Sequence, residues 1–503
     1  MSQALVPSAI LVDPDVKEKG IEFAEQELAP DIEDSQFTAE FEKKFVRKLD
    51  RLLIPAAMLL YLFSALDRGN LGNIRLLGLI GARGLSADPD GQKYALLVAM
   101  FYIGYASFII PSGLLSKRLS RPYVQVSISA FIWGTAAVCS GAVNTWAQAY
   151  GLRFLLAVGE AGYQPTVGLM LAKWYSRDEL ALRFSFFYST GAFAGIVNGL
   201  IAYGLNFSKS TVAPWRLLYI IDGCPPIALA FYSWWTLPAD INNSKRFNPE
   251  EKALALVRLH RRGTPENHQI RWRQMITVLW SWPILLPAIT NMCGLLVNAV
   301  VSVFLPTLIN EAGYSGALAQ IYTLPGYGSA FIMMLLCAYL SDKTGRRGPF
   351  VIFGFALMTI GCAMVAAITP TLEASHRNGR FAGLTLVSIG SLIIIPLNQV
   401  WVAENSGNEN RRSAGLPLFM ALGQAAAAAS GYMFPANQAP AYKAGSYACL
   451  GLSVCGLAVS ISYVVICLLV NAHRDRKEGK PDLSVAPDTA TYADKAKGFR
   501  YRW

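Results

Sequence analysis

The sequence predicts an all-α membrane protein with twelve transmembrane helices in two pseudo-symmetric six-helix bundles. Three observations lead to this prediction. Of the 503 residues, 53% are apolar and only 15% are charged, whereas about a quarter of a typical soluble domain is charged. Apolar stretches of roughly 20 residues, the length that crosses about 30 Å of hydrocarbon, recur along the chain. Two sequence patterns also repeat at nearly one offset, which indicates a duplicated unit.

The expected spans fall into two sets of six, one on each side of a long polar loop. Charged residues are absent from much of these segments, for example between Ala95 and Leu115 and between Cys449 and Val470. The expected spans are 52–74, 93–115, 123–143, 147–172, 182–205, 215–237, 279–308, 318–341, 349–369, 380–402, 413–434 and 446–471.

These spans predict five parts of the chain. They are a cytoplasmic N-terminal tail (1–50), a six-helix bundle (51–237), a cytoplasmic linker loop (238–278), a second six-helix bundle (279–471) and a cytoplasmic C-terminal tail (472–503). Both tails are expected to be solvated and mobile. Within the linker, Asn248 is followed by Pro249 and two acidic residues, which is typical of a capped helix start. We therefore expect a short surface helix there.

The net charge of +11 could suggest a nucleic-acid-binding protein, but its distribution favours another reading. Lysine and arginine concentrate in the loops and tails that share one side of the predicted bundle, while the opposite loops hold few. This asymmetry follows the positive-inside rule, which predicts that both termini are cytoplasmic. The basic charge therefore indicates membrane topology, and no nucleic-acid partner is expected.

The two predicted bundles resemble each other. The string from Gly113 to Arg121, between spans 2 and 3, recurs from Ala338 to Arg347, between spans 8 and 9. Arg153-Phe154 precedes a tryptophan by 21 residues, and Arg380-Phe381 does the same. The two offsets are 225 and 227 residues. Parallel repeats of this kind place a binding site near the middle of the membrane, between the halves.

The second copy, which contains Asp342 and Arg346, is similar to the signature of the major facilitator superfamily. Lys117 stands where the first copy usually has Asp, which is typical of the fungal anion:cation symporters, a branch that includes allantoate, nicotinate and pantothenate permeases. Other strings resemble the same branch: Leu66 to Asn73, Glu160-Ala161-Gly162, Lys173 to Glu179, Phe304 to Thr307 and Phe499-Arg500-Tyr501.

The resemblance implies a secondary active transporter that takes up a small organic anion together with protons by alternating access. It also implies a multi-pass protein of the plasma membrane that works as a monomer in the lipid bilayer. Lys117, Arg121, Asp342 and Arg346 are then expected to hold the cytoplasmic gate. An exporter of an acidic metabolite and a non-transporting nutrient sensor with a carrier fold remain alternatives.

Five charged residues lie away from the ends of the expected spans: Asp67, Arg68, Arg153, Glu160 and Asp222. A charge at the membrane centre costs roughly 2.5–3.5 kcal/mol on insertion scales, so each needs a partner, water or a function. Arg153 and Glu160 are seven residues apart, which puts them on one helix face but about 10 Å apart along the axis. A direct salt bridge between them is therefore not expected.

One interpretation is that Arg153 receives an anion while Glu160 exchanges a proton; the alternative is a fixed pair of Arg153 with Asp67 or Asp222. Related organic-anion carriers have an arginine late in span 1 and an R-x6-E string in span 4. That resemblance implies that Arg153 and Arg68 bind substrate and that Glu160 couples protons. Asp67 and Asp222 are further candidates for proton coupling, although both can be structural.

The remaining signals exclude other classes of protein. All four histidines lie in predicted loops, so a carboxylic acid is expected to carry any coupled proton. The sequence contains no phosphate-binding glycine loop, HExxH motif or nucleophile elbow. The eight cysteines fall in apolar segments without a CxxC pair, where packing is their usual role. We expect no enzyme activity, no cofactor and no metal. Asn206 begins a possible glycosylation sequon in an outward loop.

Overall fold

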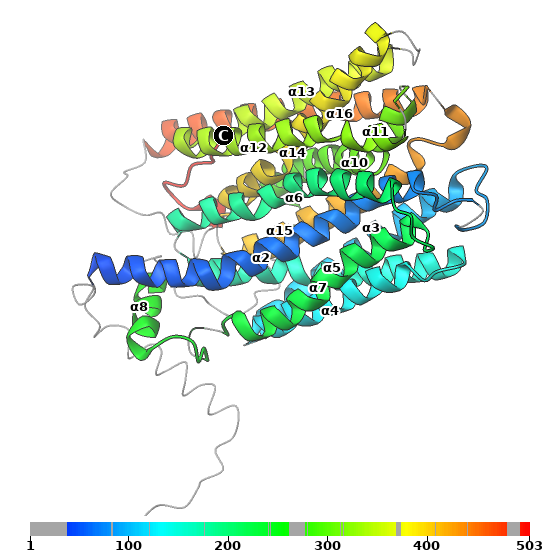
Figure 1. Ribbon diagram of the computed structural model, residues 1–503. Coiled ribbons are helices and arrows are strands. Elements are labelled where there is room, and N and C mark those ends of the chain that lie inside the picture. Colours follow the sequence, from blue (N-terminus) through cyan, green and yellow to red (C-terminus); the bar gives the residue numbers. More distant parts are fainter. Residues whose placement is uncertain are drawn as a thin grey trace, which may run out of the picture.

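The chain folds into a bundle of long helices whose axes are nearly aligned, parallel or antiparallel to one another (Figure 1). The computed structural model describes residues 38–81, 84–119, 121–175, 177–239, 241, 243–260, 277–278, 280–311, 313–314, 316–368, 374–407, 409–439, 441–479 and 493–503. In this part of the chain the only β-type pairing is an isolated bridge between Ile80 and Leu85.

Six long helices form the first group. They are α2 (Ala39–Leu76), α3 (Gln92–Arg118), α4 (Pro122–Ser140), α5 (Trp146–Trp174), α6 (Arg177–Asn206) and α7 (Pro214–Thr236). Within this group α5 packs on α3 and α4, α4 packs on α7, and α2 packs on α6 and α7. The short helix α8 (Pro249–His260) follows and begins at the proline that the sequence indicated.

The second group contains six spans, two of which are interrupted. Its helices are α10 (Trp282–Glu311), α11 (Gly316–Ile321), α12 (Leu324–Thr344), α13 (Gly348–Ala367), α14 (Ala374–Asn405), α15 (Glu409–Ala427) and α16 (Lys443–Glu478). Residues 322–323 separate α11 from α12, where Pro325 lies in the first turn of the new helix. The 3-10 turn Ala428–Tyr432 extends α15.

The described residues include eleven helices that are long and apolar enough to cross a membrane. The twelfth long helix, α5, has 29 residues but carries Arg153 and Glu160. It packs between α3 and α4, which places these charges inside the protein instead of against lipid. The predicted all-α architecture of twelve long membrane helices in two groups of six is therefore confirmed.

The two ends of the bundle differ in their contacts. We name the end at which α2 begins and α16 ends the inner end, and the opposite end the outer end (Figure 1). At the outer end the two groups touch: the side chain of Asn206 donates to Gln320, and an added Cβ on Gly72 would lie 2.2 Å from the carbonyl oxygen of Val303. The ion pair of Asp50 with Arg183, nearer the inner end, stays within one group. The outer end is therefore closed by contacts between the groups.

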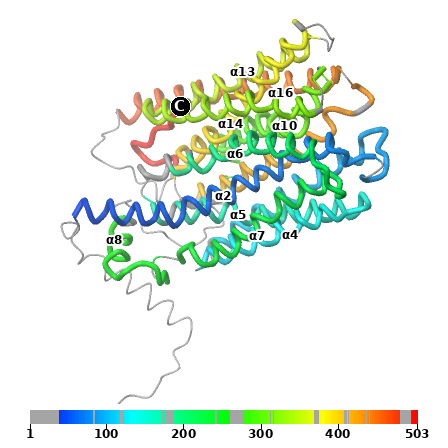
Figure 2. The backbone as a smooth tube through the Cα atoms, in the orientation of Figure 1, coloured from blue at the N-terminus to red at the C-terminus, as the bar shows by residue number. Residues whose placement is uncertain are grey.

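Two terminal regions differ from the expectation of solvated tails. Helix α2 begins at Ala39 because the Thr38 side chain caps its first turn, and Lys48 of this extension pairs with Glu251 of α8 at 2.7 Å. Residues 493–503 fold back onto the inner end, where Tyr501 is buried; Figure 2 shows this red segment beside the end of the bundle. The prediction was wrong for these residues, because they find apolar and charged partners. Residues 1–37 lie outside the described part.

Candidate functional site

The candidate site is an ion pair between α2 and α5, formed by Arg68 and Glu160. Nη2 and Nε of Arg68 lie 2.8 Å and 2.9 Å from Oε2 of Glu160. The same oxygen accepts a hydrogen bond of 2.8 Å from Oγ of Ser64, which precedes Arg68 by one helical turn. The Glu160 side chain is fully buried, whereas that of Arg68 is 20% exposed. The pair therefore joins a fully buried carboxylate to a partly exposed arginine side chain.

Aromatic rings surround the guanidinium of Arg68. Its Cζ lies 4.8 Å from the ring centre of Tyr105 and 5.3 Å from that of Phe101, distances at which ring faces attract cations. The hydroxyl of Tyr105 donates to Gln164 of α5, which fixes the orientation of the ring. A guanidinium flanked by two aromatic rings suits a ligand that has a carboxylate and a planar apolar part.

One carboxylate oxygen of the pair is left open. Oε1 of Glu160 is buried and has no hydrogen-bond partner in the part of the chain that the structure describes. A buried carboxylate oxygen without a donor is costly when the group is charged. A proton on Oε1 removes this cost, so the geometry suits a carboxyl group that alternates between its two protonation states.

Arg153, which was predicted to bind substrate, lies inside the helix bundle. Its side chain is buried, with 3% of the residue exposed, and Nη1 donates to the backbone oxygen of Asp67 at 3.2 Å. Its Cζ lies 4.9 Å from the ring centre of Phe101, so this ring contacts the guanidinium groups of both Arg68 and Arg153. Arg153 therefore borders the site behind Phe101.

Asp67 and Asp222 form a second buried acidic group, between α2 and α7. Asp67 is 2% exposed and Asp222 is fully buried, and they lie close enough for their charges to interact. Neither oxygen of Asp222 has a hydrogen-bond partner among the described residues, and Oδ2 of Asp67 has none either. Asp67 lies close enough to Arg153 and Arg68 for their charges to interact.

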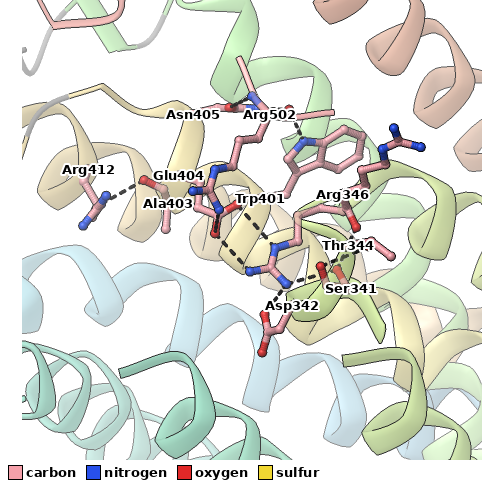
Figure 3. A network of polar contacts seen from close by, with 11 residues as sticks. Ser341, Asp342, Thr344, Arg346, Trp401, Ala403, Glu404, Asn405, Arg412 and Arg502 are labelled. Carbon is pink, nitrogen blue, oxygen red and sulfur yellow. Dashed lines mark hydrogen bonds and ion pairs between the residues drawn. The ribbon is translucent and has the colours of Figure 1, made fainter. Parts of the chain in front are cut away.

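At the inner end a separate set of charges joins α12, α13 and α14, and we name it the inner cluster: Asp342, Arg347 and Glu404. Arg347 contacts Asp342 and also Glu404, with Nη2 3.0 Å from Oε1. Figure 3 shows Asp342 and Ser341 on α12 and Glu404 on α14. The guanidinium of Arg347 also donates to Ser341. With only 5% of its side chain exposed, Arg347 is held by three partners.

The predicted gating residues are distributed differently. Arg346 does not take part in the inner cluster, because its guanidinium lies 4.3 Å from the ring centre of Trp503. Arg121 is exposed at the start of α4, and the side chain of Lys117 lies outside the described part. Asp342 alone of the four predicted residues pairs within the cluster.

One cavity of the described residues does not coincide with these charges. It has a volume of about 570 Å³ and lies toward the inner end. Its lining residues are Asp50, Ile54, Pro55, Met58, Leu59, Arg183 and Phe186. None of the five charged residues inside the spans lines it. We base the candidate site on the Arg68–Glu160 pair, because an ion pair inside a membrane protein requires a functional or structural reason, whereas a mostly apolar hollow does not.

Sequence reasoning missed several residues of the site. Ser64 lies four residues before Arg68 and therefore on the same helix face, so the spacing could have revealed it. Phe101 and Tyr105 show the same spacing in α3 but carried no signal that distinguishes them from other aromatic residues in spans. Arg347 was missed because two adjacent arginines in a loop give no indication of which one turns inward.

Comparison with known proteins places the chain in a family. The family model for the Major Facilitator Superfamily matches residues 57–416. The chain is 27% identical over 474 residues to the major facilitator-type transporter hxnP of Emericella nidulans, covering 92% of this chain and 93% of that protein. It is also 27% identical over 475 residues to the high-affinity nicotinic acid transporter of Saccharomyces cerevisiae, covering 92% and 85%.

The fold comparison agrees. The xylose transporter XylE from E. coli superposes with a TM-score of 0.62 at 15% identity, covering 81% of this chain and 95% of that chain. At such low sequence identity the superposition shows the shared fold alone. The predicted family is confirmed, and these fungal relatives are consistent with the anion:cation branch. The chain is a membrane transporter, not an enzyme, and it belongs to the Major Facilitator Superfamily.

Proposed function

We propose that this transporter carries a small organic anion, a carboxylate, into the cell together with a proton. The observation that carries the proposal is the pair in which Arg68, partly exposed, contacts the buried Glu160. When Glu160 takes up a proton, Arg68 loses its counter-ion and becomes available for the carboxylate of a substrate. Anion and proton then enter the site together, which is the requirement for symport.

The surroundings of the pair support this proposal. Rings of Phe101 and Tyr105 flank the guanidinium and suit a planar acid, in keeping with the yeast relative that transports nicotinic acid. In this proposal Arg68 is the residue that contacts substrate, while Arg153 positions Phe101 and adds positive charge behind it. Asp67 and Asp222 are further proton acceptors on the far side of α2.

Transport requires that the two ends open in turn. We propose that the helix groups 51–237 and 279–471 move as two halves, that the inner end faces the cytoplasm, and that the protein acts as a monomer in the plasma membrane. The contacts at the outer end, including Asn206 with Gln320, then break when the outer side opens. The positive-inside distribution of lysine and arginine supports this orientation.

Uptake of labelled nicotinate by cells that express the chain tests the proposal. We expect uptake that rises as the external pH falls and that a protonophore abolishes. Glu160→Gln is expected to remove the pH dependence, and Arg68→Ala to remove uptake, while Arg68→Lys keeps the charge but loses the two-nitrogen contact. Arg476→Ala, on the exposed last turn of α16, is the matched control. If the Glu160→Gln variant still shows uptake that depends on pH, the coupling role of Glu160 is refuted. Efflux in place of uptake would indicate an exporter.

A further inference from the structure

Two asparagines at the inner end of the second half bind the backbone of a neighbouring peptide segment, residues 493–503. The side chain of Asn471 in α16 donates to the carbonyl oxygen of Tyr501 at 2.8 Å and accepts from its N–H at 2.9 Å. Asn405 in α14 makes the same pair of bonds with Arg502, both at 2.9 Å. Paired contacts of this kind recognise an extended backbone, as peptide-binding domains do at a sheet edge.

Side chains of the same segment fill a pocket between helices. Tyr501 is 4% exposed, and its ring centre lies 4.9 Å from that of Trp282 at the start of α10. Its hydroxyl donates to Oδ2 of Asp494 at 2.9 Å, and Asp494 pairs with Arg411 of α15. An aromatic anchor with a satisfied hydroxyl is typical of a residue that dominates a binding interface.

The segment also contacts the inner cluster. The carbonyl oxygen of Trp503 accepts from the backbone N–H of Arg347 at 3.2 Å. Nη1 of Arg502 lies 3.2 Å from Oε1 of Glu404, the oxygen that also contacts Arg347. Figure 3 shows Arg502 between Asn405 and Glu404, with the ring of Trp401 beside them; the indole N–H of Trp401 donates to the carbonyl oxygen of Arg502 at 2.8 Å.

We propose that the inner end of the second half is a peptide-docking site, that residues 493–503 occupy it, and that docking holds Arg347 and Glu404 in their paired geometry. The segment thereby joins the inner ends of α10, α13, α14, α15 and α16 and positions the gate of the transporter. All these contacts stay within the second half, so the segment can remain docked while the two halves move relative to each other.

Docking has a consequence for the transport cycle, and this part rests on the alternating access proposed above. An inner cluster that the segment holds in its paired geometry favours closure of the inner end. Because the two ends open in turn, loss of the segment is expected to leave the inner end open and the outer end closed for more of the time. The effect is on the distribution of conformations, since the segment does not contact the Arg68–Glu160 pair.

The docking site is tested first by peptide binding, which needs no transport substrate. A fluorescent peptide with the sequence of residues 493–503 is added to detergent-purified protein from which these residues are deleted. We expect saturable binding, weakened about tenfold or more by Asn471→Ala or Asn405→Ala in the protein, because each removes a pair of hydrogen bonds. Lys497→Ala in the peptide is the matched control, because Lys497 is exposed and exposed substitutions of this kind change affinity little.

The positioning role is tested by thiol labelling at the outer end. Gln320 is fully buried in the closed outer end. In a variant whose exposed cysteines Cys139, Cys224 and Cys455 are replaced by Ser, a Gln320→Cys thiol therefore reacts with a membrane-impermeant maleimide only when that end opens. We expect deletion of 493–503 to slow this labelling several-fold in right-side-out proteoliposomes, and added peptide, sealed inside, to restore it. Arg476→Ala, on the exposed last turn of α16, should label at the rate of the unaltered protein.

The outcomes separate the two proposals. Absence of peptide binding, or equal labelling with and without the segment, would overturn the inference. If the deletion impairs folding, Asn471→Ala and Asn405→Ala in the full chain replace it, and labelling at the unaltered rate in both would again overturn the inference. Failure of every tested acid to be taken up would instead refute the proposed substrate class, because neither readout uses substrate.

Discussion

The ion pair between Arg68 and Glu160 allows a prediction whose magnitude follows from its geometry. Replacing Arg68 by Leu removes both nitrogen contacts of 2.8 Å and 2.9 Å to Oε2 and leaves a fully buried carboxylate with only the Ser64 hydroxyl as donor. Breaking a buried pair from one side costs about 3–5 kcal/mol of stability, because the remaining charge is uncompensated. We therefore expect Arg68→Leu to lower the free energy of unfolding by that amount.

The reverse change is expected to cost less. In Glu160→Gln the neutral amide can remain in place, and Arg68 keeps contact with solvent through its 20% exposed side chain, so we expect a loss of about 1–2 kcal/mol. The double variant has no unpaired buried charge and should lie close to Glu160→Gln. The coupling energy between the two positions then equals the whole effect of Arg68→Leu, about 3–5 kcal/mol.

Denaturant unfolding in mixed micelles, followed by tryptophan fluorescence, measures the four proteins of this double-mutant cycle. Arg121→Leu serves as control; this exposed position should change the free energy of unfolding by less than about 0.5 kcal/mol. If the effects of Arg68→Leu and Glu160→Gln simply add in the double variant, the two side chains do not interact, and the proposed exchange of a proton for an anion loses its basis.

Three further predictions follow from the described contacts. Arg347→Ala should destabilise the protein by about 1–3 kcal/mol, since two carboxylates lose a charged donor. Arg346→Ala loses one ring contact and should cost about 0.5–1 kcal/mol in the same unfolding assay. Equal losses would contradict the assignment of Arg347, and not Arg346, to the inner cluster. Gly72→Ala should disfavour the closed outer end, because its Cβ meets the backbone oxygen of Val303, and should therefore speed labelling of Gln320→Cys. Gly151→Ala faces open space and should leave the labelling rate unchanged. The backbone N–H of Gly498, with a smaller contribution from Arg500, lowers the pKa of Glu478. Docking of residues 493–503 should therefore weaken as pH falls through that lowered pKa, below the ordinary glutamate value, and Glu478→Gln should reduce this acid dependence of peptide binding.

Part of the site could be found without a structure. Charges inside apolar segments are rare enough that Arg68, Arg153 and Glu160 stood out at once, and the seven-residue separation of Arg153 from Glu160 ruled out their direct contact. The partner of Glu160 could not be found in this way. Arg68 is 92 positions away, and whether it meets Glu160 depends on how α2 and α5 are rotated about their axes.

The sequence by itself determined which segments span the membrane, how the chain is divided and which family it belongs to, because these properties follow from local hydrophobicity, loop charge and short motifs. Only the tertiary structure decided that Arg68 pairs with Glu160 while Arg153 lies behind Phe101, that Arg347 and not Arg346 enters the inner cluster, and that residues 493–503 dock on the second half. Each of these outcomes depends on side chains from different helices meeting at distances of about 3 Å, and a pattern along one chain carries no information at that scale.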